Sequence, residues 1–396
     1  MKSEFTTKPL SSLADIQTGP FGSQLHKEDY VQNGTPIVTV EHLGQKRFTE
    51  QNLPCVSEID KERLNKYILR EGDVVFSRVG SVDRCSYVSR EYSGWMFSGR
   101  CLRVRPCIEI DSQYLYYYFT LESTKQFVRG IATGATMPSI NTKFMGEVPI
   151  AYPPIDEQRK IATVLSALDN RIELNDKINK NLEQQAQTLF DNFYDSLSGQ
   201  SCILSEIIDI RDGTHDSPKA TEHGYPLVTS KHLLPFGVDT SSANIISKAD
   251  YDKVNERSKV NTGDILISMI GTVGLISYVI DSPVEFAIKN VGLFKTSQHP
   301  SLDLYILYYL KNKSTTQHIE KCLAGSTQKY ISLGELRKLP IVVPSPDELA
   351  AYNLVVRPIV SEIALLVQEN RRLSNLRDTL LPKLMSGELD VSGLDL

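Results

Sequence analysis

A helical pattern that occurs twice in the chain, 191 residues apart, places the strongest constraint on the fold. The first copy begins near Pro154, where neighbouring prolines stiffen the entry and Asp156 can cap the free amides of the first turn. Over about forty residues, apolar positions then alternate at spacings of four and three, the pattern of a coiled-coil seam. At 1.5 Å per residue, such a helix is roughly 60 Å long. The repetition predicts two long helices that pair with each other, and not two helices of a globular core.

The two helical patterns share one register. The apolar positions of the first copy are Ile161, Leu165, Leu168, Ile172, Leu182, Ala186, Leu189 and Phe193. The matching positions of the second copy, apolar except for Arg377, are Tyr352, Val356, Ile359, Ile363, Leu373, Arg377, Leu380 and Leu384. Asn179 corresponds to Asn370, and an asparagine in a seam is satisfied only opposite a polar partner. We therefore expect Asn179 and Asn370 to pair and to fix the register, unless both lie solvated on the helix flanks.

The residues ahead of each helical pattern also repeat, most clearly in a turn and strand at 71–80 and 262–271. A Gly-Asp turn leads into a β-branched strand that ends at a glycine loop, and structural demands alone explain these residue types. The copies differ at Arg78 against Met269, and at residues 83–84 against 274–275. Since the demands of the fold are weaker where the copies differ, specificity for a ligand could reside at these positions.

Two further loops, residues 134–140 and 325–331, carry glycine and small hydroxyl residues ahead of the strand that leads into each helix. Exposed amides and hydroxyls suit contact with phosphate, and they suit an ordinary turn equally well. Basic residues also gather between Arg78 and Arg105, although such a group is more often a solvated strand face than a reader of a DNA groove. The sequence leaves these alternatives open.

The composition is that of a soluble protein with free thiols. The chain of 396 residues can hold two globular domains besides the helices, and 41% of its residues are hydrophobic. No apolar run approaches the roughly eighteen residues of a membrane helix, and the N-terminus lacks the core of a signal peptide, so we expect a cytoplasmic protein without a membrane partner. The six cysteines form no zinc-like group. A formal charge of −5 argues against indiscriminate coating of nucleic acid but permits local readout.

No catalytic site is evident in the sequence. A DNA adenine methyltransferase would need a glycine loop for its methyl donor and an Asn/Asp-Pro-Pro-aromatic segment for the target base. The nearest segments, residues 19–22 and 152–155, do not meet these requirements. A Walker loop is absent, and the seven histidines show no ligand spacing. We therefore expect no catalytic residue, no metal and no cofactor in this chain.

Several segments together carry a family likeness. They are the proline-led helix entries at 148–161 and 339–348, the Gly-Asp strands that end in Ser77 and Ser268, and the closing segment 380–389. With this combination the chain resembles the specificity subunit of type I restriction-modification enzymes. The resemblance implies an α+β fold, in which two tandem α/β target recognition domains are separated by two long helices that form an antiparallel coiled coil with a pseudo-twofold repeat. The implied segments are recognition domains at 1–153 and 198–344 and conserved spacer helices at 154–197 and 345–389.

The resemblance also implies partners. Each recognition domain would read one half of a bipartite site in double-stranded DNA. The helices would set the gap between the halves and dock two methyltransferase subunits, which bind S-adenosylmethionine. Restriction subunits that use ATP and magnesium for translocation would join them, and this chain would hold none of these cofactors. The side chains that we expect to contact DNA are basic or polar and are Lys46, Arg47, Arg78, Arg84, Lys231, His232 and Lys329.

Two functions from other classes stay open on the sequence alone. One is a self-contained DNA adenine methyltransferase with an atypical donor site, which would bind S-adenosylmethionine in isolation. The other is a two-headed coiled-coil adaptor that does not bind DNA. Neighbouring genes for a methyltransferase and a helicase-nuclease would argue against the adaptor.

Overall fold

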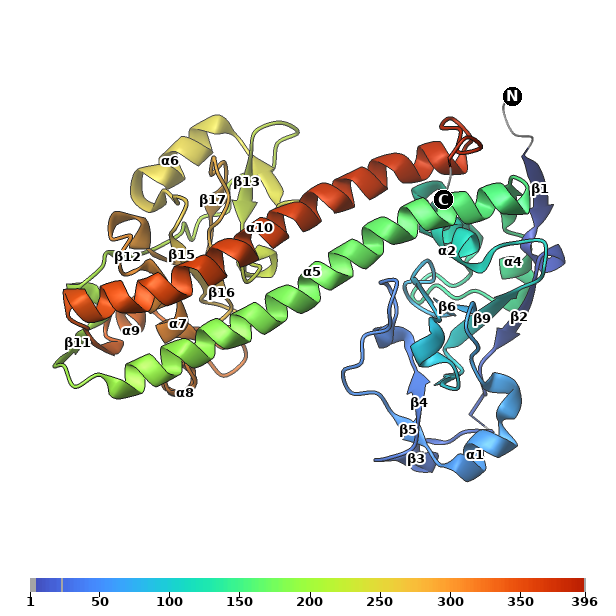
Figure 1. Ribbon diagram of the computed structural model, residues 1–396, viewed down its shortest axis with the longest axis horizontal. Helices are drawn as coiled ribbons and strands as arrows, with labels where there is room; N and C mark the ends of the chain where they lie inside the picture. Colours follow the sequence, from blue (N-terminus) through green and yellow to red (C-terminus); the bar gives the residue numbers. More distant parts are fainter. Residues whose placement is uncertain (1–4, 23, 395–396) are drawn as a thin grey trace. The chain divides into compact units, whose positions relative to one another are not determined.

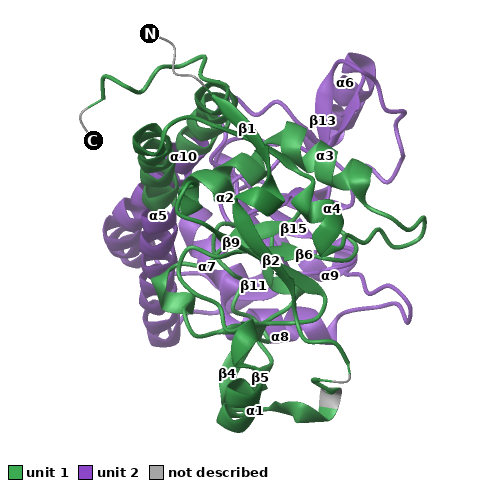
Figure 2. Cartoon of the chain, turned by 90° about the vertical axis from the view of Figure 1, so that its right-hand side faces the viewer, with its two compact units in different colours: residues 1–172, 372–396 green, residues 173–371 purple. Residues whose placement is uncertain are grey.

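The computed structural model describes residues 5–22 and 24–394 and divides the chain into two compact units. Unit 1 contains the chain up to residue 172 and again from residue 372, and unit 2 contains residues 173–371 (Figure 2). Two long helices, α5 (Ile155–Ser196) and α10 (Pro346–Met385), are seen in Figure 1, and each contributes one part to each unit. The prediction of two long helices is confirmed, and the unit boundaries fall inside these helices. The division into four segments stays a prediction.

Unit 1 is built on a four-stranded antiparallel sheet with the order β2-β9-β6-β7. Its strands are β2 (Ala14–Thr18), β9 (Cys101–Pro106), β6 (Val74–Ser77) and β7 (Cys85–Tyr87). Side chains alternate along a strand, so Val74 and Phe76 of β6 enter one core while Val75 enters another. Both faces of the sheet are therefore buried, which explains the continuous apolar run in this strand.

Helices cover one face of this sheet and a second small sheet covers the other. On the helical face, Phe76 meets Phe119 edge to face, with 4.6 Å between ring centroids. The short helices of unit 1 are α1 (Glu58–Arg63), α2 (Ser112–Thr120), α3 (Glu122–Ile131) and α4 (Thr142–Gly146). The small sheet has the order β3-β5-β4-β8 and consists of β3 (Tyr30–Val31), β5 (Cys55–Val56), β4 (Thr35–Val38) and β8 (Met96–Phe97). A separate antiparallel pair consists of β1 (Thr6–Pro9) and β10 (Pro149–Tyr152).

Unit 2 repeats the architecture of unit 1. Its main sheet has the order β12-β18-β15-β16 and consists of β12 (Ile210–Asp212), β18 (Val291–Phe294), β15 (Ile265–Ser268) and β16 (Ile276–Tyr278). The other strands form β14-β13-β17 and β11-β19 and are β14 (Asn244–Ile246), β13 (Tyr225–Val228), β17 (Ala287–Ile288), β11 (Ser201–Ile203) and β19 (Pro340–Val342). The short helices are α6 (Lys248–Ser258), α7 (Asp303–Lys311), α8 (Lys313–Lys321) and α9 (Leu333–Arg337). Ser77 pairs with Cys101 in unit 1 as Ser268 pairs with Val291 in unit 2, which confirms the internal repeat.

The long helices also belong to the cores of the units. Ile161 and Leu165 of α5 are buried in the core of unit 1, together with Leu384 of α10. Phe190 of α5 is buried in the core of unit 2, together with Tyr352 of α10. The interpretation of these helices as a seam only is therefore wrong, because each end of each helix also closes a globular core.

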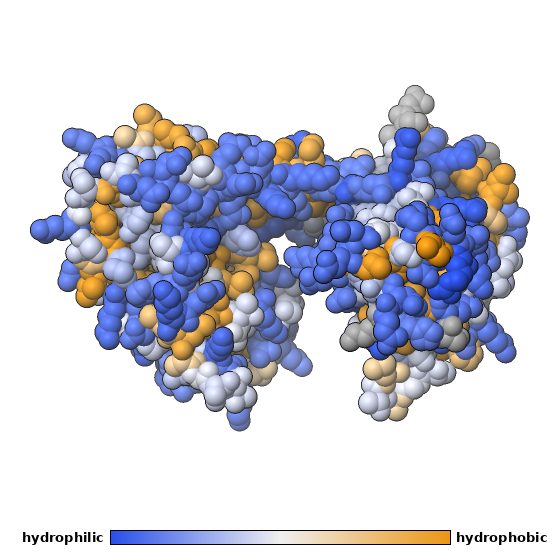
Figure 3. All heavy atoms as spheres, turned by 90° about the horizontal axis from the view of Figure 1, so that it is seen from below, coloured by the Kyte–Doolittle hydropathy of each residue, from blue (hydrophilic) through white to orange (hydrophobic). Residues whose placement is uncertain are grey.

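The expectation that no segment is apolar enough to cross a membrane is wrong for α10. An 18-residue window of this helix has a mean hydropathy of 1.5, and 28% of the window is buried. The buried side chains of α10 in unit 2 pack into the core and include Leu349, Val356 and Ile363. Its exposed apolar side chains include Leu354 and Leu365. On the face of the molecule in Figure 3, hydrophilic residues predominate, and the apolar ones form separate small groups.

Contacts within each unit show that α5 and α10 run antiparallel. In unit 2 the rings of Phe193 and Tyr352 stack with 4.8 Å between centroids, and Asn175 Nδ2 donates to Asn370 Oδ1 over 2.8 Å. In unit 1 Arg377 Nη1 donates to Asp169 Oδ1, also over 2.8 Å. The residue numbers of each contacting pair add up to 545 or 546. A constant sum means that one helix descends as the other ascends, so the predicted antiparallel pairing is confirmed.

The same contacts correct the predicted asparagine pair. Asn370 bonds to Asn175 and not to Asn179, whose Oδ1 is buried without a partner among the described residues. In an antiparallel pair related by a twofold axis, a residue meets its own copy only at the axis. Asn179 and Asn370 are copies that each lie two residues from that point, so the constant sum places Leu366 opposite Asn179. The prediction assumed that positions which correspond in the repeat are also in contact, and this is not so for Asn179 and Asn370.

The arginine that interrupts the second seam has a specific partner. The Arg377 guanidinium pairs with Asp169, whose other oxygen accepts a 2.6 Å hydrogen bond from the Tyr117 hydroxyl of α2. The copies of Arg377 and Asp169 in unit 2 are Ala186 and Val360, both buried. An ion pair in one unit thus replaces an apolar contact in the other, at the same place in the repeat.

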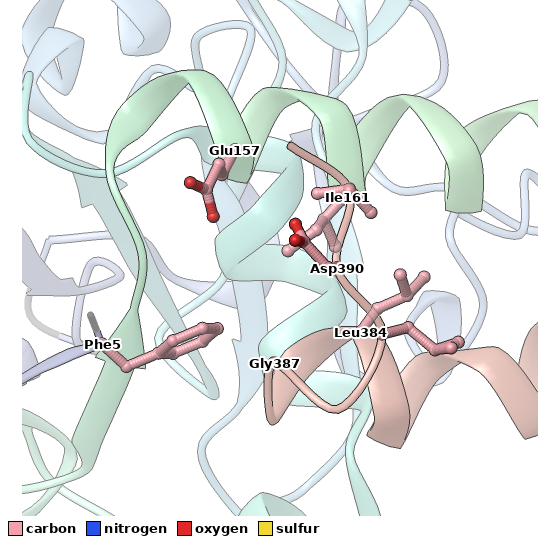
Figure 4. Close-up of a pocket in the computed structure, with 8 residues that line it drawn as sticks. Phe5, Glu157, Ile161, Leu384, Gly387 and Asp390 are labelled. Carbon is pink, nitrogen blue, oxygen red and sulfur yellow. The ribbon is translucent and has the colours of Figure 1, made fainter. Parts of the chain in front are cut away.

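The end of α10 is closed against the start of α5 within unit 1. Gly387 adopts φ +68°, and an added Cβ would lie 2.8 Å from the Phe5 ring, so the turn requires glycine. Phe5, Glu157, Ile161 and Gly387 border a small cavity of about 10 Å³ (Figure 4). Beyond it, the Lys160 ammonium donates to the Ser392 carbonyl over 2.7 Å.

Two leucine substitutions on α5 should change stability in different directions. Asn175→Leu removes the hydrogen bonds to Glu369 and Asn370 and should cost about 1–3 kcal/mol, because polar groups stay buried beside an apolar side chain. Asn179→Leu places an apolar side chain opposite Leu366 and should leave stability unchanged or raise it. Thermal unfolding of both variants measures the difference, and a lower melting temperature for Asn179→Leu than for Asn175→Leu would contradict the register.

Candidate nucleic-acid interface

In unit 1, loops from distant parts of the chain meet at one end of the main sheet. The Arg78 amide donates to the Arg100 carbonyl over 2.8 Å, and the Ile140 amide donates to the Arg78 carbonyl over 3.0 Å. The Gly80 amide donates to the Pro138 carbonyl over 2.8 Å. The loop after β6 therefore lies between the loop before β9 and the glycine loop at 134–140.

Unit 2 assembles the equivalent loops in the same way. The Ile331 amide donates to the Met269 carbonyl over 2.9 Å, and the Gly271 amide donates to the Lys329 carbonyl over 3.2 Å. The serine that ends the strand holds the loop in both units, since the Ser77 hydroxyl donates to the Val79 carbonyl and the Ser268 hydroxyl to the Thr272 carbonyl. These serines have a structural role in a loop frame that occurs twice.

A second repeated element borders each loop group and has the sequence Thr-x-x-His. In unit 1 the Thr39 amide donates to His42 Nδ1 over 3.0 Å, and in unit 2 the Thr229 amide donates to His232 Nδ1 over 2.9 Å. Both histidines are buried, with exposed fractions of 1% and 3%. Each one caps a short 3-10 turn, Val40–His42 or Ser230–His232. His232 is therefore a buried cap residue, and its burial argues against the contact with DNA that the sequence predicted.

The loop group of unit 1 surrounds an open groove of about 610 Å³. Its lining includes the aromatic rings of Phe21 and Tyr30, the Glu41 carboxylate, and the side chains of Arg78 and Arg100. The Arg78 guanidinium lies 4.9 Å from the centre of the Phe21 ring and donates to the Gly99 carbonyl over 3.2 Å. Two cations, an anion and two aromatic faces in one groove suit recognition of a nucleic acid.

The four residues expected to contact DNA in unit 1 separate into two places. Arg78 lines the groove, whereas Lys46, Arg47 and Arg84 gather around the loop at 43–47. The Lys46 ammonium donates to the Tyr117 hydroxyl over 3.1 Å, and Arg47 forms an ion pair with Glu91. Arg84 is exposed and donates to the Leu43 carbonyl. All four side chains have partners in the protein, but only Arg78 lines the groove, so Arg78 is the better placed for DNA.

In unit 2 the two lysines expected to contact DNA are exposed and border the same loop. Lys329 precedes Tyr330, whose backbone pairs with Ile270. Lys231 belongs to the capped turn, where the Ser230 hydroxyl donates to the Ile270 carbonyl over 3.3 Å. The structure thus brings the segments that carry Lys231 and Lys329 to the loop at 269–272.

The family model described as type I restriction modification DNA specificity domain matches residues 2–184 and again residues 202–349. The chain belongs to this family. It is the specificity subunit of a type I restriction-modification system and contains the family's domain twice in tandem.

Relatives and one solved structure agree with this assignment. The chain is 26% identical to the MjaIX specificity subunit of Methanocaldococcus jannaschii over 72% of this chain and 71% of the relative. It is 24% identical to the putative MjaX specificity subunit of the same organism, over 92% and 89% of the two chains. The crystal structure of the S subunit from M. genitalium matches with a TM-score of 0.59 and 16% identity, over 97% of this chain and 96% of that one. At this identity the structural match shows the fold alone.

The sequence reasoning missed the polar group of the second specificity domain. His215 Nδ1 lies 2.8 Å from Asn290 Oδ1, and His215 Nε2 lies 3.1 Å from the carboxylate of Asp212, which Arg257 also contacts. Of these residues, His215 and Arg257 border a second depression, of about 350 Å³. The sequence does contain a signal for this group. The segment Gly-Thr-His at 213–215 directly follows a strand, at the place in the repeat where the first domain has Gly-Pro-Phe at 19–21. Among the residues that the structure describes, no three His, Cys, Asp or Glu side chains could together hold a metal ion.

Protonation of His232 should couple the stability of unit 2 to pH. Burial lowers the pKa of His232 below its ordinary value of 6.5. The unfolded chain therefore binds a proton in a pH range where the folded chain does not, so stability is full above pH 6.5 and falls as the pH drops below it. Melting temperatures measured from pH 7 to pH 5 should decrease more for the natural protein than for His232→Gln. Equal slopes for the two proteins would contradict the buried, neutral ring.

Proposed function

We propose that each unit of this specificity subunit reads one half of a bipartite site in double-stranded DNA. The observation that carries the proposal is that one chain holds the same loop frame twice, with different side chains at the exposed positions. Ser77 and Ser268 each donate to a carbonyl of the loop that follows the strand, whereas at the exposed position of the neighbouring cap Glu41 in unit 1 corresponds to Lys231 in unit 2. Two copies of one reader with unlike surfaces suit two unlike half-sites.

The long helices would set the gap between the two half-sites. Helix α5 is unbroken over 42 residues and α10 over 40, and each takes part in both units. Two readers joined by rigid helices recognise two half-sites at only one separation and one helical phase. We therefore propose that the length of the paired helices determines the length of the unread gap in the DNA.

The same helices would dock two methyltransferase subunits. Leu174 of α5 and Leu365 of α10 are copies in the repeat, and both are exposed, at 48% and 60%. Leu354 and Leu376 lie eleven residues on either side of Leu365, which places the three on one face of α10. Exposed leucines at equivalent positions suit two identical partners on a single pseudo-symmetric chain.

The chemistry would belong to the partner subunits. Methyltransferase subunits would bring S-adenosylmethionine, and restriction subunits would bring ATP and magnesium for translocation and cleavage. This chain would be the non-catalytic DNA reader of a cytoplasmic complex. The basic and polar side chains of the loop groups support that role, and the net charge of −5 suits a local contact better than a general affinity for DNA.

Sequencing of DNA methylation in cells with and without this gene tests the bipartite site. Cells that also express the cognate methyltransferase should methylate a motif of two short specific halves separated by a fixed gap, and the motif should disappear when the gene is removed. A continuous motif without an unread gap would overturn the proposal.

Calorimetry on the isolated chain tests the division of labour. Titration with S-adenosylmethionine should give no heat of binding, and the assembled complex with the methyltransferase should bind the donor. Saturable binding to the isolated chain would favour a self-contained adenine methyltransferase with an atypical donor site.

A further inference from the structure

We propose that Glu41 and Lys231 read bases in the two half-sites, with opposite hydrogen-bonding roles. Each is the third residue of a Thr-x-x-His cap. The Glu41 carboxylate would accept from the exocyclic amine of a cytosine or adenine, and the Lys231 ammonium would donate to guanine O6 or N7, in the major groove. This inference rests on the proposed function and assigns residues to it.

The cap holds both residues in the same place on their units. Residue 41 lies between Thr39 and His42 of the cap as residue 231 lies between Thr229 and His232, and the distances from the threonine amide to the histidine ring agree within 0.1 Å. The buried histidine anchors each 3-10 turn to its unit, and the residue just before the histidine is exposed to solvent. The Glu41 side chain is 69% exposed, and Lys231 is exposed as well.

The charge reversal between the two positions decides between phosphate and base. Every DNA phosphate carries the same negative charge, so a position that contacts phosphate should be basic in both copies. A position that reads a base must instead match the edge of a different base in each half-site. Glutamate in one copy and lysine in the other, on one backbone frame, agrees with base reading.

The surroundings of Glu41 agree with this role. Glu41 lines the groove together with Arg78 and Arg100, yet within the described residues neither arginine forms an ion pair with it. Its carboxylate accepts from the Thr39 hydroxyl over 3.1 Å, and the His42 ring lies 4.0 Å away. One carboxylate oxygen thus has free acceptor capacity at the mouth of a groove whose cations can hold the DNA backbone. The hydrogen bond from Thr39 fixes the orientation of the carboxylate, as recognition of a base edge requires.

In unit 2 Lys231 stands beside a loop that carries no acid to neutralise it. The neighbouring segment is residues 269–272, which the Ser230 hydroxyl holds through the Ile270 carbonyl. Among the described residues, no carboxylate lies within 4.0 Å of the Lys231 ammonium. The lysine is therefore available as a donor where Glu41 is available as an acceptor.

A methylation assay on a randomised site tests the proposal. The subunit is assembled with its cognate methyltransferase and given a DNA library in which both half-sites are randomised, and methylated molecules are sequenced. Glu41→Lys should change the base preferred at one position of one half-site about tenfold or more and leave the other half-site unchanged. Lys231→Glu should do the same to the other half-site.

Conservative variants and matched controls make the outcome decisive. Glu41→Gln keeps an acceptor, adds a donor and should favour adenine at the affected position. Glu62→Lys on α1 and Lys313→Glu on α8 impose the same charge changes at exposed positions outside the caps and should alter no base preference. If Glu41→Lys raised methylation of all sequences alike, residue 41 would face phosphate and the inference would fail. A natural protein that methylated no two-part motif would instead sink the proposed function, so the two failures are distinguishable.

Discussion

The antiparallel contact between α5 and α10 is the interaction on which both units depend. Neither unit completes its core without side chains from both helices: Leu165 and Leu384 are buried together in unit 1, and Phe190 and Tyr352 in unit 2. Separating the helices would open two cores at once. The two helices therefore have a structural role besides any role in spacing. Their place in both cores also explains why α10 is apolar.

Comparison of the two copies of the repeat distinguishes residues that the fold requires from residues that can differ with the ligand. The buried histidine caps and the strand-end serines are the same in both units, because they satisfy backbone groups that any unit of this shape must satisfy. The residues that face outward from this frame differ in charge and size. An Arg377 and Asp169 ion pair in one unit matches buried Ala186 and Val360 in the other, so even the interior varies where geometry permits.

Much of the fold could be predicted from the sequence, because the helical spacing and the 191-residue repeat are properties of the residue order. The long helices, their antiparallel pairing and the internal repeat were predicted correctly. The asparagine pair was wrong, because sequence equivalence under a twofold axis identifies copies and not neighbours. The core role of the helix ends was missed because one apolar stripe can face a partner helix and a sheet together.

The candidate site was less predictable from the sequence. The candidate DNA-contacting residues were chosen because they are basic. In the structure His232 is buried, and Lys46 and Arg47 contact other residues of the protein. Glu41 was overlooked because an acidic residue does not suggest DNA, and Arg100 because only the backbone contact with Arg78 brings it into the groove. Residues of this kind come together only where distant loops meet in the folded protein, and no local sequence pattern shows this.

Disulfide trapping between the two helices tests the central claim most directly. Cysteines placed at Asn175 and Asn370 should form a disulfide under mild oxidation, which peptide mapping would detect, because these side chains meet in the antiparallel register. The pair at Asn179 and Asn370 should remain reduced. Preferential crosslinking of the second pair, or of neither, would contradict the pairing of α5 with α10 described above.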